Sequence, residues 1–318
     1  MDAYAGSVGM LQTWIFETLV QPSLYATGLI GLDEIAFEAT EWFILGALQV
    51  LLLFIVLRPL EAWRPAERWS DRQGVGVDIF YTLLHRLGLV PLLFFALLTP
   101  IADSIEGWTR LHGFMPWNVE GWWPALVEHP FTTFVIYLVV LDLAEYLRHR
   151  LQHRFELWWA LHALHHSQQR MSFWTDDRNH LLDDLLQAVW LATLALLIGV
   201  SPSQFVGIVM LTRSLESLSH ANVDLSFGRI GERLLVSPRF HRLHHAIGTG
   251  HEGVHHGCNF AILFPVWDIL FGTARWQGPI EPTGVRDQGK GRDYGASFLA
   301  QQRLGLSRVA AVISGRSV

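Results

Sequence analysis

The sequence is poor in cysteine, and this limits the ways in which it could bind a metal. Cys258 is the only cysteine in 318 residues. One thiol cannot form an internal disulfide, complete a thiolate zinc site or hold an iron–sulfur cluster. Any metal must therefore be bound by imidazole and carboxylate groups, and any electrons for redox chemistry must come from another molecule.

Charge is also scarce, whereas apolar residues are abundant. Charged residues make up 16% of the chain and hydrophobic residues 51%, which is unusual for a soluble protein. The net charge is −6 and the basic residues form no stripe, so nucleic acid is not an expected partner. Lys290 is the only lysine among 23 basic residues, a bias that suggests a GC-rich bacterial coding sequence. The composition predicts an integral membrane protein, which we place in a bacterial inner membrane.

Long apolar runs predict an all-α fold, a polytopic bundle of about four to five membrane helices, since about 20 apolar residues are needed to cross a bilayer. We expect the last two runs to form a tight helical hairpin. The runs are residues 42–57, 79–101, 131–141, 185–200 and 205–211.

The predicted domain organisation follows from these runs. Residues 1–40 are apolar but lack the basic start of a signal peptide, so we expect them to lie in the membrane interface. Residues 41–275 are predicted to form the membrane domain that carries the chemistry. Residues 276–318 are expected to form a polar C-terminal tail.

Basic residues predict the orientation, because short cytoplasmic loops are rich in arginine and lysine. The loop at residues 58–77 has four arginines, whereas the loop at 102–130 has one arginine and four acidic residues. Following the chain from these loops places residues 148–184, and the chain after Arg213, on the cytoplasmic side. Thirteen of the sixteen histidines lie at positions 149–256, and therefore share that side in a helical cap.

The histidines follow helical spacing. The segments His162–His166 and His241–His245 each place histidine at their first, fourth and fifth positions, so three imidazoles leave one face of a helix. His149 and His153 add a further pair, near the end of the helix that begins at Phe131. Eight imidazoles suffice for two metals, whereas one structural zinc needs only four ligands. Imidazole suits zinc, copper, iron and nickel alike, so ligand type does not choose the metal. The eight candidate ligands are His149, His153, His162, His165, His166, His241, His244 and His245.

Two carboxylates precede the first histidine pair on the same helical stripe. Asp142 and Glu145 lie seven and four positions before His149. We expect each to accept the second ring N–H of a metal-bound imidazole and so to orient it. The alternative is an ion pair with Arg148 or Arg150.

One competing motif indicates a different chemistry. His251-Glu252-x-x-His255 matches the string of zinc peptidases, which requires a regular helix. Four glycines between positions 248 and 257 favour a loop instead. A membrane zinc hydrolase is therefore kept as an alternative, together with a non-catalytic metal- or haem-binding membrane protein.

The three histidine motifs occur in an order, with membrane helices before and between them, that resembles the fatty acid hydroxylase and sterol desaturase superfamily. The likeness runs from about residue 40 to residue 275. The spacing of His149 and His153 is closer to the sterol-oxidase branch. Further matching residues are Asp142-x2-Glu145-Tyr146, Leu157-Trp158, Arg178-x-His180, His220-x-Asn222-Val223, Asn259-Phe260 and Trp267-Asp268-x2-Phe271-Gly272-Thr273.

The resemblance implies an integral membrane oxygenase with a non-haem di-iron centre, which uses O2 and two electrons to hydroxylate or desaturate a fatty-acyl or sterol-like lipid. It implies that the eight histidines and His220 bind two iron ions, with His180 and His256 as further candidate ligands. Glu216 stands where some members have another histidine, and is expected to support the site. No His-Pro-Gly-Gly haem-binding word occurs, so we expect a separate electron donor that resembles cytochrome b5, a ferredoxin or a flavoprotein.

Overall fold

The computed structural model describes residues 2–113, 119–247, 257–276, 278 and 280–316. Within these ranges the chain forms helices joined by loops. The β pairing found there is a single bridge between Ala246 and Thr283. The predicted all-α class is therefore confirmed.

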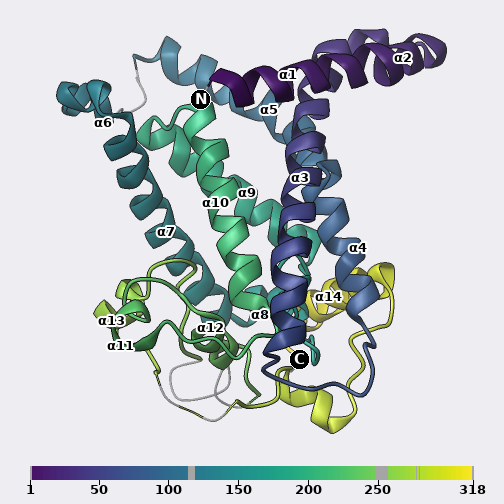
Figure 1. Ribbon diagram of the computed structural model, residues 1–318, viewed down its shortest axis with the longest axis vertical. Coiled ribbons are helices and arrows are strands. Elements are labelled where there is room, and N and C mark those ends of the chain that lie inside the picture. Colours follow the sequence, from purple (N-terminus) through teal and green to yellow (C-terminus); the bar gives the residue numbers. More distant parts are fainter. Residues whose placement is uncertain (1, 114–118, 248–256, 277, 279, 317–318) are drawn as a thin grey trace.

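Four helices are long and apolar enough to cross a membrane: α3 (Asp33–Trp63), α5 (Leu89–Leu111), α7 (Pro130–Arg154) and α9 (Leu181–Ile198). A fifth helix, α10 (Pro202–His220), returns along the bundle between α7 and α3 (Figure 1). The predicted turn between two helices near Ser201 is present, but α9 packs mainly against α7 and α8, and α10 against α3 and α12. The hydroxyl of Ser201 caps the start of α10 by accepting from the backbone N–H of Gln204 at 3.4 Å.

The N-terminal helices α1 (Asp2–Ile15) and α2 (Gln21–Thr27), joined by a π-helical segment at Phe16–Val20, run across the end of α3 rather than along it (Figure 1). The side-chain amide of Gln12 fixes this arrangement by donating to the carbonyl of Phe37 at 2.9 Å. A 3-10 turn at Ile30–Leu32 leads into α3.

The apolar run at residues 79–101 was expected to form one membrane helix, and this prediction was wrong. Helix α4 (Val75–Arg86) ends before α5 begins, and Gly88 between them has φ 93°, a left-handed conformation that glycine adopts at little cost. Arg86 lies within the apolar run but is charged. Its buried guanidinium donates to the carboxylates of Asp176 and Asp177. These partners hold the end of α4 in the polar cap.

The polar cap lies at the opposite end of the bundle from α1, at the bottom of Figure 1. It contains α8 (Glu156–His166), α12 (Pro238–His244) and α14 (Phe298–Ile313). Helix α14 packs against α8, so residues 276–318 contain a folded part of the cap. The remaining short elements are α6 (Val119–Trp122), α11 (Gly228–Gly231), α13 (Val266–Leu270) and the 3-10 turns at Pro124–Glu128 and Arg286–Lys290.

Candidate metal centre

Four helices bring nine histidines together in the polar cap, all of them buried. Helix α7 contributes two, α8 three and α10 one, while α12 and the residue after it contribute three. They divide into two groups, and the candidate ligand atoms within each group lie within 4.8 Å of one another. The first group is His149, His153, His162, His166 and His244, and the second is His165, His220, His241 and His245.

In the first group, the ring nitrogens are oriented by acceptors outside the group. The Nδ1 atom of His149 donates to the carbonyl of Phe260 at 2.8 Å, and that of His244 to the carbonyl of Cys258 at 2.7 Å. A carbonyl can only accept, so in a neutral ring the proton is on Nδ1 and the lone pair is on Nε2. Within the described part of the chain, the buried Nε2 of His149 has no hydrogen-bond partner. A lone pair buried in this way suits a metal cation.

In the second group, ring nitrogens approach one another closely. The Nε2 atom of His220 lies 3.1 Å from Nε2 of His165 and 3.0 Å from Nε2 of His241, which lies 3.2 Å from Nε2 of His245. His220 donates through Nδ1 to the carbonyl of Glu216 at 2.8 Å, which leaves only a lone pair on its Nε2. Nitrogens bound to one metal at about 2.1 Å would lie about 3.0 to 3.4 Å apart. The spacing therefore fits a shared metal ion.

The histidines of the cap are held in the neutral form that binds metals. Burial, followed by the proximity of other histidines, holds the pKa of His165, His166, His241 and His245 well below the ordinary value. Neutral imidazole has a lone pair available at physiological pH. The donor set therefore fits two metal ions, and it includes no thiolate.

Asp183 is a buried carboxylate beside the histidines that the motifs in the sequence did not indicate. It accepts from Nε2 of Gln152 at 2.8 Å and from Nε1 of Trp158 at 2.7 Å, and it lies 3.3 Å from Nδ1 of His162. This contact directs Nε2 of His162 into the first group, where it has no hydrogen-bond partner among the described residues. The available signal was an acidic pair, Asp183 and Asp184, at the start of an otherwise apolar membrane helix, where charge is costly.

The two carboxylates expected to orient imidazoles have other partners. Asp142 accepts from the backbone N–H groups of Leu263 and Phe264 at 2.9 and 3.1 Å. It therefore stabilises the loop that includes Phe260, the acceptor for His149. Glu145 forms an ion pair with Arg148 at 2.8 Å, which is the alternative interpretation.

The remaining candidate site residues lie at different distances from the two histidine groups. Glu216 touches the second group through its backbone carbonyl, and its half-buried side chain lines a cavity beside the histidines. His180 lies apart from both groups, because its Nδ1 accepts from the N–H of Leu182 at 3.1 Å and its Nε2 lies 2.9 Å from the carbonyl of Gln302. It caps the start of α9. His251, Glu252, His255 and His256 lie outside the described residues.

A cavity of about 70 Å³ connects the two groups with the ends of α7, α9 and α10. A water molecule in the liquid takes about 30 Å³, so the space admits only a few small molecules. Its walls include His149 and His162 from the first group and His165 from the second. Ile262 lines it as well, among mostly polar neighbours. Small reactants could therefore reach both groups from one space.

Comparisons with known proteins identify relatives over most of the chain. An ornithine lipid hydroxylase of Rhizobium tropici is 28% identical over 92% of this chain and 84% of its own length. The human alkylglycerol monooxygenase is 28% identical over 74% of this chain, which spans only 47% of that protein. A Delta(7)-sterol 5(6)-desaturase of Gibberella zeae is 27% identical over 57% of this chain and 54% of its own.

No solved structure is a significant match to the chain. Residues 134–273 match the fatty acid hydroxylase family, and this segment contains all nine clustered histidines. The resemblance seen in the order of the three histidine motifs is thus confirmed, because the segment that carries all three motifs matches the fatty acid hydroxylase family.

Proposed function

We propose that this protein is a membrane oxidoreductase that hydroxylates or desaturates a lipid at a non-haem di-iron centre, with O2 as co-substrate. The observation that carries the proposal is the division of nine buried histidines into two groups, each with enough nitrogens for one metal. The named relatives act on an ornithine lipid, alkylglycerols and a sterol, which supports a lipid substrate.

Each group of histidines would hold one iron ion. The bound irons would supply the activation of O2 and the removal of hydrogen from an unactivated C–H bond, which acid–base side chains cannot achieve. The protein residues orient the ligands. The carbonyls of Phe260 and Cys258 and the carboxylate of Asp183 fix which ring nitrogen of His149, His244 and His162 carries the proton.

The cavity beside the two groups gives the chain a place to exclude bulk water. It is bounded by residues of α7, α9 and α10, three helices of the membrane bundle. A lipid would therefore reach the centre from the bilayer side, with the target carbon near the cavity. Gln187 and Glu216, which line this space, would meet the part of the substrate next to the metals.

Electrons would enter from a separate donor protein on the cytoplasmic side. The single cysteine, Cys258, is buried, and a lone thiol cannot store the two electrons needed.

To test the orientation of the protein in the membrane, the exposed Ser307 of α14 is changed to cysteine and treated with a membrane-impermeant thiol reagent. We expect labelling only after the membrane is permeabilised, whereas the matched Ala125→Cys variant should react in intact cells. The reverse pattern contradicts this orientation.

Lipid extracts test the activity. Cells with and without the gene are compared by mass spectrometry, and we expect a lipid that has gained one oxygen atom or lost two hydrogen atoms. A strain that expresses His162→Ala should lack this product because one ligand of the first group is missing. Identical lipid profiles in all three strains contradict the proposal.

A further inference from the structure

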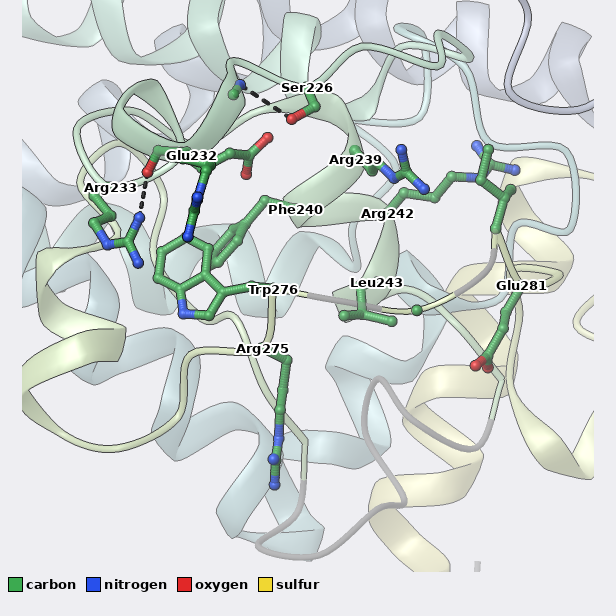
Figure 2. Close-up of a pocket in the computed structure, with 14 residues that line it drawn as sticks. Ser226, Glu232, Arg233, Arg239, Phe240, Arg242, Leu243, Arg275, Trp276 and Glu281 are labelled. Atoms are coloured by element: carbon green, nitrogen blue, oxygen red, sulfur yellow. Dashed lines mark hydrogen bonds between the residues drawn. The ribbon is translucent and has the colours of Figure 1, made fainter.

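A second pocket, of about 570 Å³, is lined in part by residues of α12 (Figure 2). His241, His244 and His245 occupy one face of this helical segment, whereas Arg239, Arg242 and Leu243 lie on the opposite face and line the pocket. The rest of the wall comes from residues 226–233 and from described residues between 275 and 281. The pocket is therefore separate from the metal centre.

The wall of this pocket carries an excess of positive charge. Among the described residues of the wall, five arginines face two glutamates, and Glu232 already accepts from the hydroxyl of Ser237 at 2.6 Å and from the N–H of Phe227 at 3.1 Å. Arg233 packs over the ring of Trp276, 5.4 Å from its centre, which holds the guanidinium at the wall. The five are Arg229, Arg233, Arg239, Arg242 and Arg275.

Arg242 is the one buried arginine among the described residues of this wall. It is only 4% exposed, and it forms an ion pair with Glu67, at 2.5 Å from Nη2. Its Nε and Nη1 atoms have no hydrogen-bond acceptor among the described residues. Buried N–H donors of a cation are costly to leave unbonded. An anion in the neighbouring pocket would add negative charge beside this guanidinium, which has one partly exposed carboxylate as its ion-pair partner.

We propose that this pocket binds a phosphate group. Guanidinium groups bind phosphate oxygens in pairs, and several arginines around one pocket suit an anion with several oxygens rather than a single carboxylate. The pocket is separate from the metal centre, so this proposal does not depend on the oxygenase activity.

The surroundings favour a phospholipid headgroup as the source of the phosphate. Ile230 and Leu234, next to two of the arginines, are 77% and 62% exposed, and Leu270 of α13 is 68% exposed. Phe271, which follows α13, stacks on Tyr146 at 5.3 Å, about two turns before the end of the membrane helix α7. Leu270 and Phe271 therefore lie beside the last turns of the membrane helix α7, the part of the fold nearest the membrane surface, where anionic headgroups are found.

Titration of the full-length protein in neutral detergent tests the proposal. Native mass spectrometry would follow binding of dihexanoyl phosphatidylglycerol, dihexanoylglycerol, which lacks the phosphate, and inorganic phosphate. We expect the phosphatidylglycerol to bind and the phosphate-free lipid not to bind. Arg242→Gln and Arg239→Gln should each weaken binding roughly tenfold, while the matched Arg303→Gln variant on the exposed side of α14 should not.

Competition with inorganic phosphate distinguishes a phospholipid headgroup from free phosphate as the ligand. Displacement of the lipid by inorganic phosphate at similar concentrations supports the phosphate site and identifies free phosphate as a sufficient ligand; lipid binding that resists phosphate supports the headgroup. Two results overturn the proposal: equal binding of the two lipids, and unchanged lipid binding in Arg239→Gln. Binding of an acidic protein and of neither lipid nor phosphate would also overturn it. Because Arg242 is buried against Glu67, the exposed Arg239 keeps the test valid if Arg242→Gln does not fold.

Discussion

Asp183 connects one histidine of the first group, His162, with the side chains of Gln152 and Trp158. One carboxylate accepts from Gln152 of α7 and Trp158 of α8 and also contacts His162. Such a contact fixes the tautomer of a ligating imidazole and increases its basicity. The residue therefore acts on the metal through His162 rather than by binding it.

Substitution of Asp183 tests this role. In Asp183→Asn the amide still accepts a hydrogen bond but carries no charge, so we expect iron affinity to fall by about 10- to 100-fold. Iron retained per chain during dialysis against a chelator measures the change. The matched control is Asp184→Asn, because Asp184 contacts His85, 3.0 Å away, and not a candidate ligand. Equal iron retention in the two variants contradicts the assignment.

At this scale, the sequence predicted what depends on local spacing. The three histidine motifs could be found because a helix places positions three and four apart on one face. Asp183 could not be found in this way, because its contacts depend on how α9 packs against α7 and α8. Asp142 lies on the expected stripe, but loop backbone groups more than 120 residues away are its partners.

The arrangement of α3 and α4 depends on a close approach between their backbones. A Cβ atom added to Gly46 of α3 would lie 1.6 Å from the carbonyl oxygen of Arg86, at the end of α4. Only glycine permits this distance. The contact fixes α4 where Arg86 reaches the buried carboxylates Asp176 and Asp177.

Replacement of Gly46 by alanine should therefore destabilise the protein. We expect the free energy of unfolding to fall by about 1 to 3 kcal/mol, because backbone must move to relieve the overlap. Thermal unfolding followed by tryptophan fluorescence measures it. Gly76→Ala in α4 is the control, since a Cβ there meets nothing within 4 Å and alanine favours the helix. A Gly46→Ala variant as stable as Gly76→Ala would contradict the close packing.

Element boundaries show where apolar periodicity stops being informative. The turn between α9 and α10 was predictable because Ser201, Pro202 and Ser203 interrupt two apolar runs. The break between α4 and α5 was missed because the run at residues 79–101 was treated as one apolar segment, although Gly88 within it adopts the left-handed conformation that ends many helices.

For the whole molecule, the buried histidines make stability depend on pH. Burial lowers the pKa of His165, His166, His241 and His245 below the value of about 6.5 that they have in an unfolded chain. As the pH falls through this value, the unfolded chain takes up protons that the folded protein does not. The free energy of unfolding of the metal-free protein should therefore fall by about 1.4 kcal/mol per pH unit for each such histidine.

The thermal midpoint of metal-free protein tests this dependence. We expect it to decrease steadily between about pH 7.5 and about pH 5.5, over the range in which histidines of the unfolded chain become protonated. A midpoint that is constant over this range would show that the histidines are not buried in the neutral form.

The overall architecture could be predicted more fully than the surface of the cap. Apolar runs and histidine spacing indicated a membrane bundle with a histidine-rich cap. The arginine pocket beside α12 did not show in the sequence, because its arginines come from segments up to about 45 residues apart and surround no common motif. Only the fold places them around one space.

The most direct test of a di-iron centre at the nine histidines is the number of iron atoms bound per chain. Protein purified anaerobically after growth with iron would be analysed for all transition metals, together with the His162→Ala variant. We expect two irons per chain in the wild type and fewer than two in the variant, with loss of lipid oxidation. One zinc per chain and no iron, with lipid oxidation retained in His162→Ala, would contradict a di-iron centre.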